Sequence, residues 1–271
     1  MPLPIANAAD ILTTSLHLLA ISLGPFVVFA VVIHLLEKTI QRTLAERFGW
    51  KSVMWTGWLG TPIHELSHVV MCYLFNHRVQ EVALFEPDRA SGRLGYVRHT
   101  WIKGNWFQEL GNVFIAIAPL MGGSIALCLL LWLFFPEVIE TAFVPAGLET
   151  QSTVTDRVIS VFSQIADPAN LLSIKFWVFV YLVLCVSSHM APSRSDYQGA
   201  GKGSVLFTGL ALLLSGLIAA TVADPIEFQL SMAQLLSPLF GVLAIATFLC
   251  VIATLVVALL ASRFPKRYVI R

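Results

Sequence analysis

Long apolar runs separated by shorter polar segments dominate the hydropathy pattern of this chain. A helix needs roughly 20 apolar residues to cross a hydrocarbon core of about 30 Å. Six runs approach or exceed that length, at residues 11–36, 53–75, 112–135, 171–190, 204–223 and 238–261. The pattern therefore predicts an all-α polytopic membrane protein with about six transmembrane helices.

The composition agrees with a membrane protein. Hydrophobic residues make up 57% of the 271 residues and charged residues only 12%, whereas soluble domains carry about 25% charge. The mean hydropathy is +0.78. A net charge of +1 argues against a nucleic-acid partner. Because no internal repeat or low-complexity linker divides the chain, we expect one membrane-embedded domain over residues 1–271.

Two of the runs contain features with alternative interpretations. After the first run, residues 37–51 place apolar side chains at steps of four, which predicts either an amphipathic helix at the membrane surface or a helical tail of the first span. In the second run, Thr61-Pro62 can begin a new helix at Pro62. Pro62 can equally kink one long helix. The second run therefore either crosses the membrane or re-enters it.

A β-hairpin is predicted directly after the second run. Residues 79–85 and 93–99 are β-prone and flank residues 86–92, which are rich in turn formers. A free strand edge there can pair with an extended peptide. The alternative is a connecting hairpin without a function.

The distribution of basic residues predicts the orientation. Residues 76–111, residues 191–203 and the C-terminal tail are basic, and the segment 136–170 is acidic. Basic segments face the cytoplasm in membrane proteins. We therefore expect a multi-pass protein of the cell (inner) membrane with a cytoplasmic C-terminus.

The chemistry is concentrated in a His-Glu-x-x-His motif inside the second run. Residues four apart share one helix face, so His64 and His68 can point at a common metal ion. Glu65 lies about 100° around the helix from His64. Two imidazoles and one further ligand leave a zinc position open for water, and a carboxylate beside that water acts as general base. The motif predicts a catalytic Zn²⁺ site.

A catalytic zinc site needs a third protein ligand. Asp196 and His189 lie at the end of the fourth run and are the two candidates, with Asp196 favoured and His189 as alternative ligand or substrate contact. Asn112 opens the third run, where it either caps the helix, the favoured interpretation, or binds a substrate backbone. Other candidates are less well placed: Asp10, His17, His34, His77 and His99.

These residues resemble the site-2 protease-like family of intramembrane zinc metalloproteases. The resemblance rests on His64-Glu65-x-x-His68, the following hairpin-like region and Pro192-x-x-x-Asp196-x-x-Gly199. That family shows an Asn-Pro…Leu-Asp-Gly motif whose aspartate is the third zinc ligand. Here Ser195 and Tyr197 flank Asp196 instead.

The resemblance implies an intramembrane zinc endopeptidase in which Glu65 activates a zinc-bound water and a membrane-associated polypeptide in the lipid bilayer is the substrate. Two alternatives remain open on the sequence. One is a non-catalytic membrane protein, either a pseudoprotease or a divalent-metal transporter. The other is a zinc hydrolase that acts on a non-peptide substrate.

Overall fold

The computed structural model describes residues 8–138, 163–165, 167–193, 195–221 and 225–265. In chain order the elements are α1 (Ala8–Phe48), α2 (Trp50–Leu74), β1 (Arg78–Ala83), β2 (Tyr96–Thr100), α3 (Trp106–Phe134), α6 (Pro168–Leu171), α7 (Ile174–Ser187), α8 (Ala200–Thr221) and α9 (Pro225–Ser262). The order confirms the predicted helical class and the hairpin that follows the histidine-bearing helix.

Each of the six apolar runs occurs as a helix, but the helices differ in their capacity to span a membrane. Four of the described helices, α1, α3, α8 and α9, are long and apolar enough to cross one. The 14 residues of α7 are apolar and extend about 21 Å at 1.5 Å per residue, which is shorter than a hydrocarbon core. α2 has 25 residues and is not among the four. The helices α2 and α7 pack against each other and against α3.

The polar stretch after the first run is the tail of α1. The helix continues through Pro25 to Phe48, and Ile40 and Leu44 of its apolar stripe are buried in the core. Gly49 ends the helix with a φ of 80°, a conformation that glycine adopts without a Cβ clash. The apolar stripe therefore packs against the protein and does not form a separate surface helix.

Of the two alternatives for the second run, the structure has the single long helix. α2 begins at Trp50, directly after Gly49, and continues through Pro62. Gly60 allows a close approach to α7, because a Cβ at this position would clash with the backbone carbonyl of Cys185. The face of α2 that carries the histidines is therefore held directly against the C-terminal end of α7.

The third run begins earlier than predicted. α3 starts at Trp106, and the side chain of Asn105 accepts hydrogen bonds from the backbone N–H groups of Phe107 and Gln108 at 3.1 and 3.3 Å. The prediction that Asn112 caps this helix was wrong, because the preceding residues already form its first turn. Asn112 is a buried residue inside α3.

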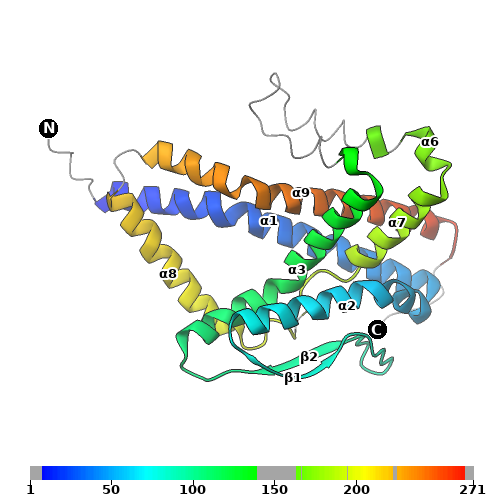
Figure 1. Cartoon of the computed structure of the whole chain (residues 1–271), viewed down its shortest axis with the longest axis horizontal. Helices are drawn as coiled ribbons and strands as arrows, with labels where there is room; N and C mark the ends of the chain where they lie inside the picture. The colour runs from blue at the N-terminus through cyan, green and yellow to red at the C-terminus, as the bar shows by residue number, and fades with distance from the viewer. Residues whose placement is uncertain (1–7, 139–162, 166, 194, 222–224, 266–271) are drawn as a thin grey trace.

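The hairpin lies against α2. β1 and β2 are antiparallel, with Ala83 opposite Tyr96 and an irregularity between Val79 and Glu81. At Gly95, immediately before β2, a Cβ would lie 3.0 Å from Cγ of Glu65. Figure 1 shows the hairpin beneath α2. The proximity of Gly95 to Glu65 places the start of β2 beside the His-Glu-x-x-His motif.

The remaining helices form a framework around this unit. In Figure 1, α1 and α9 lie side by side along the long axis, and α3 runs obliquely from α2 toward them. The shared core includes buried residues of α1, α3, α7 and α9, among them Ile33, Leu127, Phe179 and Leu249. The helix that carries the His-Glu-x-x-His motif, α2, packs against two members of this framework, α1 and α3.

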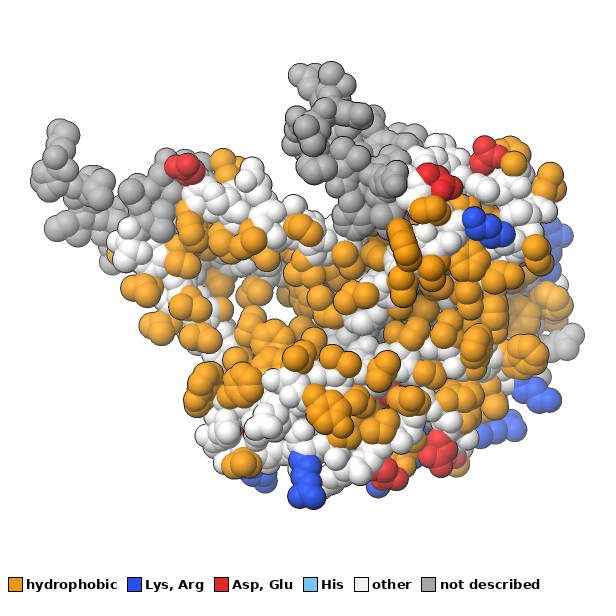
Figure 2. Space-filling model, viewed as in Figure 1, with side chains coloured by type: hydrophobic (Ala, Val, Ile, Leu, Met, Phe, Trp, Pro, Cys, Tyr) orange, Lys and Arg blue, Asp and Glu red, His pale blue; other side chains and the backbone are white. Residues whose placement is uncertain are grey.

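The face of the molecule seen in Figure 2 is rich in exposed hydrophobic side chains. Figure 2 shows hydrophobic side chains across most of the visible face, with charged side chains gathered toward its edges. Large side chains such as Trp132 on α3, Leu213 on α8 and Leu259 on α9 are exposed. A continuous apolar exterior is typical of a surface that contacts lipid.

Candidate metal centre

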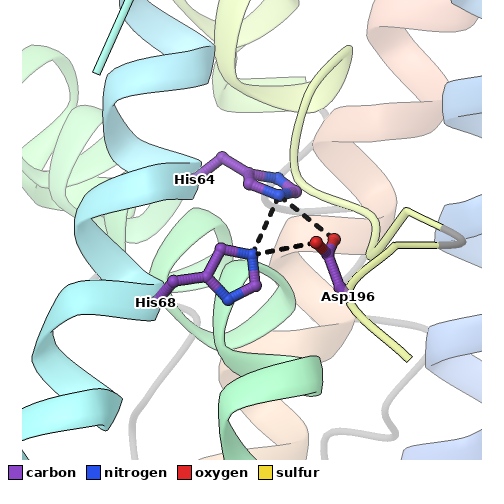
Figure 3. A group of neighbouring side chains, drawn as sticks. All are labelled: His64, His68 and Asp196. Atoms are coloured by element: carbon purple, nitrogen blue, oxygen red, sulfur yellow. Dashed lines mark hydrogen bonds and ion pairs between the residues drawn. The ribbon is translucent and has the colours of Figure 1, made fainter. Parts of the chain in front are cut away.

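Two histidines and one aspartate converge at the surface of α2. His64 and His68 lie one turn apart on this helix, and their Nε2 atoms are 3.2 Å from each other. Asp196 comes from the segment between α7 and α8, and its two carboxylate oxygens lie 3.3 Å from Nε2 of His64 and 3.4 Å from Nε2 of His68. Figure 3 shows the three side chains pointing toward one another. These three residues form a group that can hold a metal ion.

Both imidazoles are oriented by backbone carbonyl groups. Nδ1 of His64 lies 2.8 Å from the carbonyl oxygen of His189, and Nδ1 of His68 lies 2.8 Å from that of Ile115. A carbonyl oxygen only accepts, so each Nδ1 carries the hydrogen and donates it. In the neutral rings, both Nε2 atoms therefore present lone pairs toward Asp196. This is the arrangement in which metal-binding histidines are usually held.

The carbonyl group of Ile115 is available because of a proline. In an α-helix this oxygen would accept from the N–H four residues later, which is residue 119. Pro119 lies inside α3 and has no N–H. The helix therefore leaves one carbonyl group without its usual donor at the point where His68 reaches α3.

The carboxylate of Asp196 is fixed by its own segment. The backbone N–H of Ser193 donates to Oδ2 of Asp196 at 2.6 Å. In the tautomer set by the two backbone carbonyls, this carboxylate faces two nitrogen lone pairs and no N–H group of the imidazoles. Such a convergence of electron pairs favours a cation bound between the three groups.

The spacing of the three groups fits zinc. Ligand atoms about 2.0–2.1 Å from a tetrahedral Zn²⁺ are separated by roughly 3.3 Å. The two imidazole nitrogens are 3.2 Å apart, and each lies 3.3 or 3.4 Å from a different carboxylate oxygen of Asp196. One ligand atom from each residue lies within 4.8 Å of the other two. Imidazole and carboxylate are also the ligand types of catalytic zinc sites.

Glu65 lies beside this centre in a large cavity. Its side chain is 7% exposed, and it lines a cavity of about 1150 Å³ together with His64, His68 and Asp196. Residues of β2, among them Tyr96 and Arg98, also line this cavity. The predicted base and the three predicted ligands therefore share one cavity with the hairpin.

The side chain of His189 has a different position from the one expected of a ligand. Its Nδ1 lies 2.9 Å from the hydroxyl of Ser188, and its ring packs against Gly57 of α2. Burial lowers the pKa of His189 to about 4. The contact of His189 with the centre is made by its backbone carbonyl, which receives the hydrogen bond from His64.

Asn112 is not brought to the cavity. It is buried in α3, and its Nδ2 atom has no hydrogen-bond partner among the described residues. The residues that line the cavity do not include it. The structure therefore gives no support to a contact between Asn112 and a substrate.

Two further groups line the cavity: His99, which the sequence ranked among the less well placed ligand candidates, and Glu37, which was not a candidate. His99 of β2 lines the cavity and shares a 3.0 Å contact with buried His77, whose Nε2 donates to the carbonyl of Gln108 at 2.9 Å. Burial lowers the pKa of His99 to about 4, so His99 is neutral. Glu37 of α1 is the second group, and it also lines the cavity. The sequence signal for Glu37 was its carboxylate in a largely apolar helix. Burial of such a group costs free energy unless it has hydrogen-bond or charged partners.

The comparison with known families agrees with this geometry. Residues 57–172 match the family model DUF3267, described as "Putative zincin peptidase". The match includes the His-Glu-x-x-His motif, the hairpin and α3, and it ends before Asp196. It supports a zinc metallopeptidase and does not single out the site-2 protease family. Searches of curated proteins and of solved structures found no match.

The role of Pro119 gives a testable prediction. The variant Pro119→Ala supplies an N–H that competes with His68 for the carbonyl of Ile115. We expect zinc affinity to fall by about tenfold, which is typical when a group that orients a metal ligand is lost. The helix itself should become more stable. Zinc titration against a chromophoric chelator measures the first effect and thermal unfolding the second.

Pro238→Ala is a matched control for this variant. Pro238 lies inside α9 and does not line the cavity, so its replacement should leave zinc affinity unchanged. Equal zinc affinity in Pro119→Ala and in the wild type would contradict the role assigned to Pro119.

Proposed function

We propose that the protein is an intramembrane zinc endopeptidase that hydrolyses peptide bonds of membrane-associated substrates. The observation that carries the proposal is the convergence of His64, His68 and Asp196 at separations that suit one zinc ion, with Glu65 in the same cavity. The match to a zinc peptidase family over residues 57–172 supports the same chemistry. The order of the motif, the hairpin and a later aspartate supports an arrangement like that of site-2 proteases.

The proposed reaction assigns one role to each group. His64, His68 and Asp196 would hold Zn²⁺, which would supply a Lewis acid for the scissile carbonyl and for the attacking water molecule. Glu65 is the general base that takes a proton from the attacking water and later passes it to the leaving amine. The carbonyl groups of His189 and Ile115 keep the two imidazoles in the tautomer that the reaction requires.

The hairpin provides a binding site for an extended substrate. A two-stranded sheet leaves backbone N–H and C=O groups unpaired along its outer edges. β2 contributes Tyr96, Val97, Arg98 and His99 to the wall of the cavity. A peptide that adds to this strand presents its backbone to Glu65 and to the three ligands. A helical substrate must unwind first, because its carbonyl groups are occupied by its own hydrogen bonds.

The elements that surround the cavity support a membrane setting. The outward face of α2 exposes apolar side chains, including Trp55, Leu66 and Tyr73, which suit contact with lipid or with a substrate helix. The cavity also has the basic residues Lys38 and Arg93 in its wall. Basic residues mark the cytoplasmic side, so water and substrate reach the metal from that side.

Metal removal tests the proposal. The full-length protein purified in detergent should contain about one zinc per chain. Treatment with 1,10-phenanthroline should abolish cleavage of membrane-peptide substrates, and added Zn²⁺ should restore it, because the Lewis acid is lost and regained. Metal content is measured by mass spectrometry and cleavage by identification of the new peptide ends.

The alternatives give different results in this experiment. Bound zinc with hydrolysis of small amides or lipids, and of no peptide, would indicate a different zinc hydrolase. Bound zinc without any hydrolysis would favour a pseudoprotease or a transporter. The absence of zinc from protein prepared with excess metal would contradict the proposal.

A further inference from the structure

A buried carboxylate and a neighbouring amide on α1 are not used by the proposed reaction. Glu37 is 7% exposed, and Gln41 is half-buried one turn further along the same helix. Both residues line the cavity. A carboxylate in an apolar helix is costly to bury unless its oxygens receive hydrogen bonds. Its partners therefore indicate what it stabilises.

Apart from the hydrogen bond between the two side chains, their hydrogen bonds go to one short segment that follows α7. Nε2 of Gln41 donates to Oε1 of Glu37 at 3.0 Å and to the backbone carbonyl of Ser188 at 2.6 Å. The other carboxylate oxygen of Glu37, Oε2, accepts a hydrogen bond from the backbone N–H of Ala191. The two side chains thus fasten both ends of residues 188–191 to α1.

This segment is the one that organises the metal centre. The carbonyl of His189, between the two fastened ends, accepts the hydrogen bond from Nδ1 of His64. Asp196 follows Ala191 by five residues, and Ser193 between them donates to its carboxylate. A shift of residues 188–191 would therefore move the acceptor that orients His64 and the start of the chain that carries Asp196.

We propose that Glu37 and Gln41 are positioning residues of the metal centre. Their hydrogen bonds hold residues 188–191 in place against the long helix α1. That segment in turn sets the positions of a histidine ligand and of the aspartate ligand. The inference rests on the proposed function only in requiring that His64, His68 and Asp196 bind a metal ion.

The experiment compares zinc affinity in variants of the full-length protein. Glu37→Leu keeps a similar side-chain volume and removes both acceptor oxygens. The dissociation constant for Zn²⁺ should rise about 10–100-fold, which is typical when a group that orients metal ligands is lost. Glu37→Gln retains an oxygen that can accept the hydrogen bond from Ala191. Its loss of zinc affinity should therefore be smaller than that of Glu37→Leu. Gln41→Leu, which removes the bond to Ser188, is the second test variant in case Glu37→Leu does not fold.

A control variant separates positioning from general stability. Ile40 lies on the same helix and is fully buried, so Ile40→Ala should lower the temperature of unfolding. Because its side chain does not line the cavity, its zinc affinity should equal that of the wild type. All affinities are measured by chelator competition well below the unfolding temperature. The visible spectrum of Co²⁺-substituted protein then reports the ligand geometry.

The results distinguish the possible failures. Weaker zinc binding and an altered Co²⁺ spectrum in Glu37→Leu, with neither change in Ile40→Ala, would support the positioning role. Wild-type affinity and spectrum in both Glu37→Leu and Gln41→Leu would overturn it and leave the proposed function intact. Equal weakening in Ile40→Ala would also overturn it, because the effect would then be one of stability. A wild-type protein that binds no zinc would overturn both proposals.

Discussion

Glutamine in place of Glu65 is expected to reduce the rate of peptide hydrolysis by about 10²–10⁴-fold and to leave the zinc content unchanged. The amide has nearly the same shape as the carboxylate but cannot take a proton from the attacking water. A loss of about 10³-fold corresponds to roughly 4 kcal/mol of transition-state stabilisation. Because Glu65 is not a member of the metal-binding group, the affinity for zinc should be retained. Single-turnover cleavage of a membrane peptide, measured beside the zinc content, checks both parts.

Glu86→Gln provides the matched control for this variant. Glu86 is exposed between the two strands and does not line the cavity, so the same chemical change there should leave the cleavage rate unaltered. An unchanged rate in Glu65→Gln, with zinc present, would show that Glu65 is not the base. Loss of zinc from Glu65→Gln would show instead that the carboxylate helps to hold the metal.

Replacing Asp196 by alanine is expected to weaken zinc binding by more than about 100-fold, beyond the loss typical of residues that act through a ligand. The variant removes a carboxylate that contacts both imidazoles. His64 and His68 alone leave the ion with only two protein ligands, whereas catalytic sites usually have three. The fraction of protein that keeps zinc during dialysis against a chelator measures the effect.

His189→Ala should give the opposite result, because the contribution of His189 to the centre is its backbone carbonyl. Alanine keeps that carbonyl and removes only the ring that packs against Gly57. The variant should therefore be less stable to heat and still bind zinc. Zinc lost from His189→Ala and retained in Asp196→Ala would reverse the proposed assignment of the third ligand.

The periodicity of the sequence was sufficient to predict the helical segments and the first two candidate ligands, His64 and His68. Apolar runs can remain in lipid only as helices or closed barrels, because every backbone polar group must be paired there. A spacing of four residues brings His64 and His68 to one face of any helix that contains them. The two β-prone segments around a turn likewise predicted the hairpin, and the structure confirms it.

Local signals were less informative about where the helices begin and which polar residues face the site. Asparagine side chains often cap helices, and both Asn105 and Asn112 could have capped α3. The helix starts at Trp106, so Asn105 is the cap. In the sequence, Glu37 was not a candidate and His99 was one of the less well placed ligand candidates. Their importance depends on partners more than 20 residues away in the chain, at Ala191 and His77.

The sequence by itself determined the membrane class, the helical segments and the His-Glu-x-x-His face, because these depend on composition and on contacts within one or two turns. Only the tertiary structure decided that the carboxylate of Asp196, and not the ring of His189, meets the two histidines. That choice depends on how closely α2 packs against the end of α7 and on which carbonyl groups a proline or a helix end leaves available. Such contacts join residues about 50 to 130 positions apart, and no local pattern encodes them.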